Sequence, residues 1–419
     1  MATPSLPVEI CDLFVDALVE DLNSTESSPG AHEALRACSY VCRSFWMRAR
    51  RYTFAKVRIP RRYNLGGMVR FERVMSDLTA LYAYMMDAAF SITHLVKSFS
   101  IQVISYDVGE SINLPIVSLI LREFIKSKSL CELALVLQDN VVWANFDDKL
   151  KTHLLALLRS SHLSTLDICN CVDIPLDIFN DSQIKHLRLE DSLSSSPTVS
   201  LASLSSPPPL ESIEINTSFL IVDKDDKMTD ATFFRLRKLA VKISNLREMD
   251  NIHALALRAR VHLQFLKMTF SESIQTPSDS FDLARYANLR ELVLKYTRAS
   301  MPEITKLSEF LQCSDCLRNL NTIKIEVHVH TEIHHTQYFT EDNWYSLDEA
   351  LAHPYLMCLR NVSIHLRFYF PGDDSWRTIP LIGDKVSSTE GALRSLFPHM
   401  RKSSSINFRV DISARLKCR

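Results

Sequence analysis

The residues with the most distinctive chemistry are two cysteines and two histidines in the last third of the chain. Cys313 and Cys316 are separated by two residues, and His330 and His334 follow at a spacing close to that of a zinc finger. In a zinc finger the histidines lie on a helix, but here residues 323–330 alternate between apolar and polar side chains, as in a strand that buries one face. The sequence therefore predicts a solvated strand face rather than a metal site, and we expect no bound metal and no cofactor.

No other group of residues has the spacing of a catalytic site. The chain contains 10 cysteines, but none stands in a recognisable context with a matched base, as a catalytic cysteine requires. It contains only 7 glycines, which leaves little material for glycine-rich phosphate loops or nucleophile elbows. We expect a binding protein and not an enzyme, with an enzyme of an unrecognised kind as an alternative.

The charged residues are divided sharply near the start of the chain. The 419 residues carry a net charge of −1, yet residues 1–33 contain acidic and no basic residues, and residues 34–70 contain basic and no acidic ones. A basic face beside an apolar stripe suits an acidic, partly hydrophobic protein partner. A nucleic-acid patch and a solvated helical cap are the alternatives. Because Phe45, Trp46 and Tyr52 have the spacing of a core and not of a stacking platform, we expect no nucleic-acid partner.

The first 60 residues predict two or three short helices. Apolar residues from Val8 to Asp21, Leu13 and Phe14 among them, recur at helical spacing and predict one apolar stripe. Residues 23–31 are expected to form a polar loop, and helical spacing resumes over residues 33–41. A unit of this size seldom buries enough surface to be stable alone, so its stripe needs a partner.

From about residue 94 the pattern Leu-x-x-Leu-x-Leu recurs, and its last two apolar residues alternate with polar ones as in a strand. The middle apolar residues from Leu187 to Leu292 stand 26 or 27 residues apart. Such a period is typical of leucine-rich repeats, and residues 147–159, 251–260 and 302–312 have the helical spacing of their return segments. The sequence therefore predicts an α/β fold in which a small helical module precedes an irregular leucine-rich-repeat solenoid, a horseshoe.

The polar residues that alternate with the buried leucines are expected to share the opposite face of the strands. Their mixed charges fit protein recognition better than phosphate recognition, which needs charge of one sign. We expect a protein substrate to bind this face where the strands are most regular, with Phe265 as an exposed aromatic anchor. The candidate substrate-binding residues are Lys238, Lys242, Phe265, Lys267, Glu291, Lys295 and Glu326.

The start of the chain contains a specific motif. Leu6-Pro7-Val8-Glu9-Ile10, then Ala34-Leu35, and then the run from Cys38 to Trp46 resemble the F-box of the large fungal F-box and leucine-rich-repeat family over roughly residues 4–58. In that family the F-box docks on the adaptor Skp1. The resemblance implies a Skp1 contact through Leu6, Pro7, Ile10, Leu35, Cys38, Val41, Cys42 and Trp46. The longer polar loop at residues 23–31 departs from the family pattern.

The resemblance also implies a function. In the family the repeats present a protein substrate to a cullin-RING ubiquitin ligase, so the chain is expected to be the substrate-recognition subunit of an SCF-type (Skp1–cullin–F-box) ligase. The alternative is a non-catalytic scaffold or binding protein that does not engage Skp1. The expected parts are an F-box-like module at 1–60, a helical linker at 61–93 and the solenoid at 94–419. Because the chain lacks a signal-peptide pattern and a membrane-spanning apolar run, we expect no membrane partner and a cytoplasmic or nuclear location.

Overall fold

The computed structural model of the chain divides into two compact units, Met1–Ile184 and Lys185–Arg419. The residues that it describes are 7–23, 29–59, 67–88, 91–103, 115–190, 204–216, 233–244, 246–271, 283–299, 304–312, 317–330, 341–371, 390–391 and 393–417. Within these ranges the chain forms an all-parallel β-sheet arrangement with helices in the connections.

Three helices begin the first unit. They are α1 (Val8–Asn23), α2 (Pro29–Cys38) and α3 (Arg43–Thr53). Their shared core is made of small or medium side chains from each helix, namely Val15, Leu35, Cys38 and Ala49. Such side chains let the helices approach closely but bury little apolar area, so this group gains less from hydrophobic burial than the rest of the unit.

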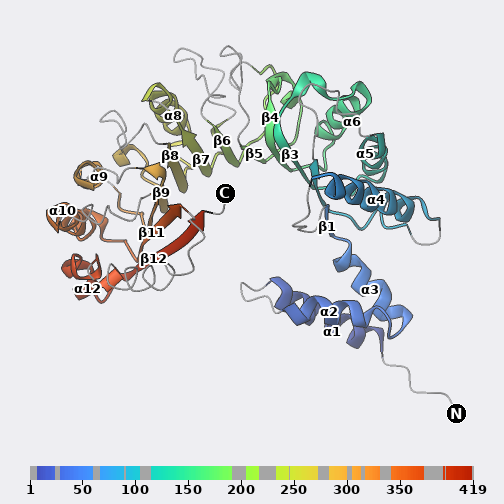
Figure 1. The fold of residues 1–419 in the computed structure, drawn as a ribbon, viewed down its shortest axis with the longest axis horizontal. Coiled ribbons are helices and arrows are strands. Elements are labelled where there is room, and N and C mark those ends of the chain that lie inside the picture. Colours follow the sequence, from blue (N-terminus) through green and yellow to red (C-terminus); the bar gives the residue numbers. More distant parts are fainter. Residues whose placement is uncertain are drawn as a thin grey trace. The chain divides into compact units, whose positions relative to one another are not determined.

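The chain passes from α3 directly into a parallel sheet. Strands β1 (Lys56–Ile59), β2 (Ser98–Val103), β3 (Glu132–Val142) and β4 (Thr165–Val172) pair in chain order. The connections carry α4 (Gly67–Met86), α5 (Pro115–Ser127) and α6 (Asp148–Leu158), which lie on one side of the strands (Figure 1). Parallel strands require crossover connections because each strand must start at the same edge as the one before.

The second unit continues the same construction with strands that again pair in chain order. The strands are β5 (His186–Glu190), β6 (Ser212–Asn216), β7 (Lys238–Ile243), β8 (Phe265–Phe270), β9 (Glu291–Ala299), β10 (Thr322–His330), β11 (Asn361–Pro371) and β12 (Asn407–Lys417). The helices are α8 (Leu246–Ala259), α9 (Ile304–Gln312), α10 (Glu341–Leu351) and α12 (Pro398–Lys402), and they cover one face of the strands (Figure 1).

The register of the second unit explains the leucine pattern. Leu239 lies opposite Leu266, and Leu266 lies opposite Leu292, so residues at the same place in consecutive strands stack on one another. All three are fully buried on the helix-covered face. Because side chains alternate across a strand, the intervening polar residues share the helix-free face.

Most elements predicted from the sequence are confirmed. The last two apolar residues of every predicted triplet lie in one of β2–β11, Phe408 of the last predicted unit lies in β12, and the three expected return helices correspond to α6, α8 and α9. The start of α6 is fixed by Asp147, whose carboxylate accepts hydrogen bonds from the backbone N–H groups of Lys149 and Leu150. The polar loop expected at residues 23–31 is wrong at its end, because α2 already begins at Pro29, a residue suited to the first turn of a helix.

The α/β class is correct, but the expected architecture of a small helical module followed by an irregular leucine-rich-repeat solenoid, a horseshoe, is wrong. The structure is an all-parallel sheet with helices, and its first strand, β1, lies inside the residues assigned to the module. The helices α1–α3 belong to the compact unit that continues to Ile184. The strand was missed because the run Lys56–Ile59 is only four residues long, with two apolar residues that alternate with two basic ones.

The expected ranges 1–60, 61–93 and 94–419 stay predictions, and the chain divides into its two compact units at Ile184. Across the ranges that the structure describes, no helix combines the length and the apolar character needed to cross a membrane.

Candidate protein-binding site

The helices α1 and α3 are joined by a hydrogen-bond network around Asp16. The Arg48 guanidinium donates to both carboxylate oxygens of Asp16, from Nε at 3.0 Å and from a terminal nitrogen at 2.7 Å. The Tyr52 hydroxyl donates to the same carboxylate at 2.8 Å. These hydrogen bonds from Arg48 and Tyr52 hold the pKa of Asp16 below its usual value. The acidic and basic segments of the sequence therefore neutralise one another at this point, and Arg48 is not part of a free basic face.

Helix α1 has two apolar faces, although one stripe was predicted. Cys11 and Val15 are buried against the other helices. Ile10, Leu13 and Phe14 lie on a different side of the helix and are exposed, Leu13 to 65%. The single-stripe prediction was wrong because it overlooked the buried set that recurs every fourth residue from Cys11. An exposed apolar face of this size on a short helix is a signature of a binding surface.

The exposed apolar surface extends to the turn between α2 and α3. Tyr40 and Val41 in this turn are 78% and 68% exposed. The start of α1 lies beside this turn, because the Cys11 side chain forms a hydrogen bond with Cys42.

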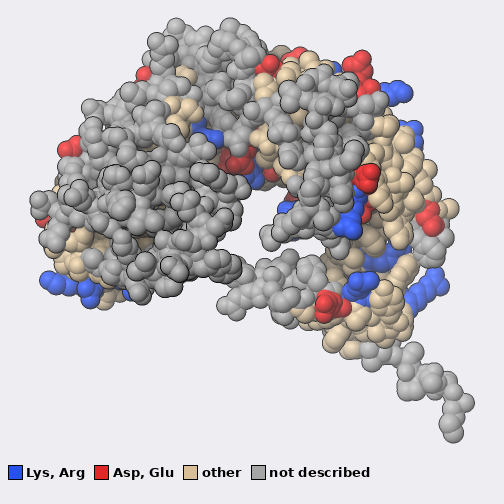
Figure 2. All heavy atoms as spheres, in the orientation of Figure 1, with Lys and Arg blue, Asp and Glu red and all other residues tan. Residues whose placement is uncertain are grey.

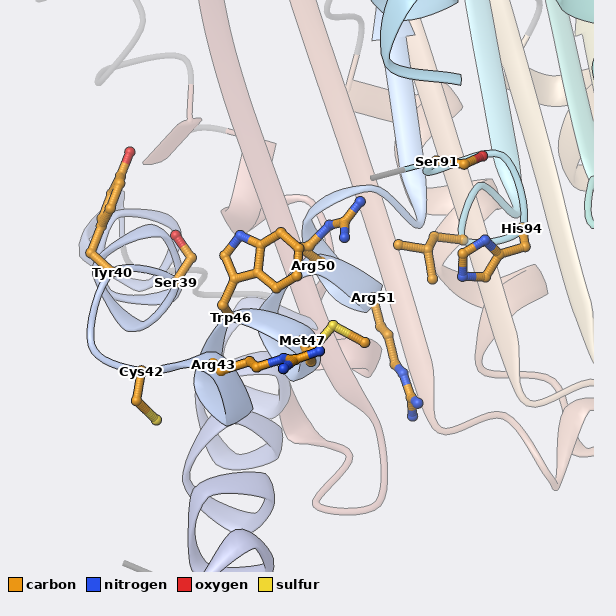
Figure 3. A pocket seen from close by; sticks show the side chains of 11 residues that line it. Ser39, Tyr40, Cys42, Arg43, Trp46, Met47, Arg50, Arg51, Ser91 and His94 are labelled. Atoms are coloured by element: carbon orange, nitrogen blue, oxygen red, sulfur yellow. The ribbon is translucent and has the colours of Figure 1, made fainter. Parts of the chain in front are cut away.

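A cationic cleft of about 650 Å³ lies next to this turn (Figure 3). One wall is α3, from which Arg43, Trp46, Arg50 and Arg51 line the cleft. The Arg50 guanidinium lies over the Trp46 ring at 4.2 Å from its centroid, a cation–π contact that fixes both side chains. Among the described residues no acidic side chain lines the cleft, and its three arginines make it cationic.

The opposite wall of the cleft is formed by residues just before β2, including Ser91 and His94 (Figure 3). This segment is held in place by two hydroxyl groups. The Ser91 hydroxyl donates to the carbonyl of Met85 at the end of α4 at 3.0 Å, and the Ser129 hydroxyl donates to the carbonyl of Thr93 at 2.7 Å. The wall is thus tied to both α4 and the start of β3, so the cleft has a fixed shape.

The residues predicted to contact an adaptor fall into three groups. Pro7, Ile10, Val41 and Cys42 are exposed, and Trp46 is half-buried with Arg50 over its ring. Leu35 and Cys38 are buried in the three-helix core, so their contribution is to hold the helices together and not to touch a partner. Leu6 lies outside the described residues.

Sequence reasoning missed Tyr40 and Met47 as exposed apolar residues, because helical spacing alone does not say which apolar residue lacks a neighbour.

The residues predicted to bind a substrate lie on the helix-free face of β7–β10. Cross-strand pairing places Lys238, Phe265 and Glu291 in one row. A second row contains Lys242, Lys295 and Glu326, with Thr269 between β7 and β9. The expectation that Phe265 is an exposed anchor is corrected, because its ring is half-buried in the row.

Several charges on this face are already paired. The Lys267 ammonium group lies 2.9 Å from a carboxylate oxygen of Glu214, and the Lys324 ammonium lies 2.7 Å from Glu291. On the side of the molecule drawn in Figure 2, basic and acidic side chains are interspersed over the described parts and are not gathered into one field of a single sign. Such a mosaic favours recognition of a protein over recognition of a nucleic-acid backbone.

The zinc-finger spacing does not correspond to a metal site among the described residues. Cys313, Cys316 and His334 lie outside the described residues, and His330 is the last residue of strand β10, as the alternation predicted. Among the residues that the structure describes, no group of three or more metal-ligating side chains is close enough to hold an ion.

Comparison with known proteins gives no assignment. No protein-family model matches the chain, and no curated protein shows significant similarity to it.

Proposed function

We propose that the chain is the substrate-recognition subunit of an SCF-type ubiquitin ligase and that α1–α3 bind a Skp1-like adaptor. The observation that carries this proposal is the exposed apolar surface at one end of the three-helix group, formed by Val8, Ile10, Leu13, Tyr40 and Val41. Apolar side chains at this density are costly to expose to water, and a partner that covers them gains the corresponding hydrophobic free energy.

The cationic cleft beside this surface supports an acidic partner. Arg43 and Arg51 are exposed at the cleft and make no ion pair within the described chain. Charges at the rim of an interface mainly raise the association rate and suppress partners of the wrong charge, while the apolar contacts supply affinity. An adaptor with an apolar groove bordered by acidic residues would complement both features.

The helix-free face of the second unit is the proposed substrate-binding surface. Its mixed charges and half-buried Phe265 fit a protein ligand, and a ligase subunit of this kind needs no active site because a cullin complex supplies the chemistry. A cytoplasmic or nuclear location follows from this proposal, since the adaptor and cullin act there.

The proposal is tested by capture of a Skp1-like adaptor by the full chain. Replacing exposed Leu13 and Val41 by Ser, as L13S together with V41S, should weaken adaptor binding at least about tenfold, because both changes remove apolar contacts at the centre of the interface. The matched control is Y84S together with M86S, which changes two similarly exposed apolar residues on α4.

Thermal melts of both variants should match the original protein, since none of the four side chains is buried. Adaptor capture that survives L13S with V41S would contradict the proposal. Binding of other proteins to the second unit without any adaptor binding would favour a scaffold instead.

A further inference from the structure

A second group of charged residues lies on the helix-free face of β9–β11, away from the adaptor surface. In β10, Glu326 pairs with Lys295 of β9 on one side and with His365 of β11 on the other. Two residues further along, His328 of β10 pairs with Arg367 of β11. Because these residues are separated by two positions along their strands, all five side chains emerge on the same face.

The cations of this group are only partly offset by the charges of the described residues. Neither Lys295 nor Arg367 forms an ion pair with a described residue, and the Nε of Arg367 is buried with no hydrogen-bond acceptor among those residues. A buried N–H group without an acceptor is costly, so the described residues do not fully satisfy the Arg367 guanidinium. Arg367 of β11 lies directly opposite His328, whereas Lys295 of β9 lies opposite Glu326. The two cations are therefore two strand spacings apart and offset by two residues, which is roughly 12 Å between their Cα atoms.

The imidazole of His328 is uncharged at neutral pH. Burial, together with the positive charges of Lys295 and Arg367, lowers the pKa of His328 to about 4, against the opposing effect of Glu326. A neutral imidazole can donate one hydrogen bond to a ligand without adding charge. The Tyr369 ring lies 5.7 Å from the His328 ring and borders the group on β11.

The remaining charged neighbours leave a net positive charge. Glu326 offsets one of the two cations, and Asp411 of β12 is paired with Arg409 at 2.7 Å. His365 is hydrogen-bonded to the hydroxyl of Ser413, with 3.1 Å between Nε2 and Oγ. Two cations against one unpaired carboxylate leave an excess of a single positive charge, which matches a single carboxylate better than a doubly charged phosphate.

We propose that Lys295, His328 and Arg367 form a binding site for a carboxylate side chain of an acidic peptide segment, and that this segment belongs to the protein substrate. The peptide lies across the strands of the helix-free face, and its Asp or Glu side chain enters between Lys295 and Arg367. The identification of the peptide as substrate rests on the proposed function, but the site itself does not depend on adaptor binding.

The test is binding of fluorescein-labelled peptides to the full chain, measured by fluorescence anisotropy at low and high salt. The probes are a short peptide of alternating Glu and Ser, the same peptide with Gln in place of Glu, and the same peptide with phosphoserine in place of Glu. The Glu peptide should bind, the Gln peptide should not, and K295Q together with R367Q should weaken the Glu peptide about tenfold, since two partly desolvated cations are removed.

The matched control is R401Q together with K402Q, which removes two exposed cations of helix α12 and should leave peptide binding unchanged. Thermal melts establish that both variants are folded. Adaptor capture is measured on the same preparations, so a failure of the proposed function appears as lost or absent adaptor capture and not as lost peptide binding. Equal binding of the Glu and Gln peptides, equal loss with R401Q and K402Q, or binding of the phosphoserine peptide alone would each overturn the proposal.

Discussion

Asp16 connects two helices through side chains that are far apart in the sequence. Its carboxylate receives three hydrogen bonds, two from Arg48 and one from Tyr52, all from α3. The core between these helices is small, so polar contacts carry an unusual share of the stability of this group. Helical spacing predicts that α1 and α3 exist, but it does not show which acidic residue of the first segment meets which arginine of the second.

Replacing Asp16 by Asn should lower the free energy of unfolding of the three-helix group by about 1 kcal/mol, because Arg48 loses its charged acceptor. The pKa of Asp16 is lower in the folded chain than in the unfolded chain, so its contribution is present at neutral pH and is lost as the pH falls below about 4. Denaturant titrations of both proteins at several pH values should therefore show a difference at pH 7 that shrinks in acid. E9Q on the same helix is the control, and a constant difference at all pH values would contradict the role of Asp16.

His328 should titrate far below an ordinary histidine. Its ring protons, followed by NMR, should shift with a midpoint near the pKa of about 4, and R367Q should raise that midpoint because it removes a repelling charge. The unfolded chain binds a proton at His328 near pH 6.5, whereas the folded chain does not until about pH 4. Stability should consequently fall as the pH drops through this window, and H328N should reduce the slope. A midpoint near 6.5 would show that His328 is neither buried nor close to the two cations.

Leucines at the same position of consecutive strands stack on one another, so shortening one of these side chains should destabilise the core. L266A should lower the free energy of unfolding by about 2 to 5 kcal/mol, because Leu266 is fully buried between Leu239 and Leu292. K267A removes the adjacent side chain on the opposite face and its ion pair with Glu214, which should cost less than about 1 kcal/mol. Urea denaturation of the two variants gives the comparison, and similar losses would mean that the assignment of the two faces is incorrect.

The short helix α12 depends on a carboxylate from another element. Asp348 of α10 is fully buried and accepts hydrogen bonds from the backbone N–H groups of His399 and Met400 and from the His399 ring. D348A should cost about 2 to 3 kcal/mol, because two buried N–H groups lose their acceptor. Amide hydrogen exchange should increase around residues 398–402, whereas E349A at the exposed neighbouring position should leave exchange unchanged. Uniform loss of protection in α10 and α12 would instead indicate global unfolding.

The sequence predicts the elements better than it predicts their pairing. The apolar triplets identify β2–β11 because each of these strands buries at least two alternating residues. The sequence pattern did not predict strand β1, because this strand has a single buried residue, Ile59. The same limit applies to the charged residues. Alternation places Lys267, Lys295 and Arg367 on one face of the sheet. It does not show that Lys267 has an ion-pair partner, whereas Lys295 and Arg367 have none among the described residues.

The division of the molecule at Ile184 predicts more than one unfolding transition. Calorimetry of the full chain should show two overlapping transitions, since compact units with separate cores need not unfold together. L133A in β3 should lower the midpoint of one transition, and L266A in β8 should lower that of the other. If each variant lowers every transition equally, the two units unfold as one.

Each strand pairs with the strand that precedes it in the chain, and this affects how the protein folds during its synthesis. Within each unit a new strand needs only the strand made just before it, so the loops that must close are short and their entropic cost arises in small steps. Ordering can therefore follow the ribosome strand by strand. Helices α1–α3 emerge before the strands, and the apolar surface of α1 is available to a partner while the later strands are still being translated.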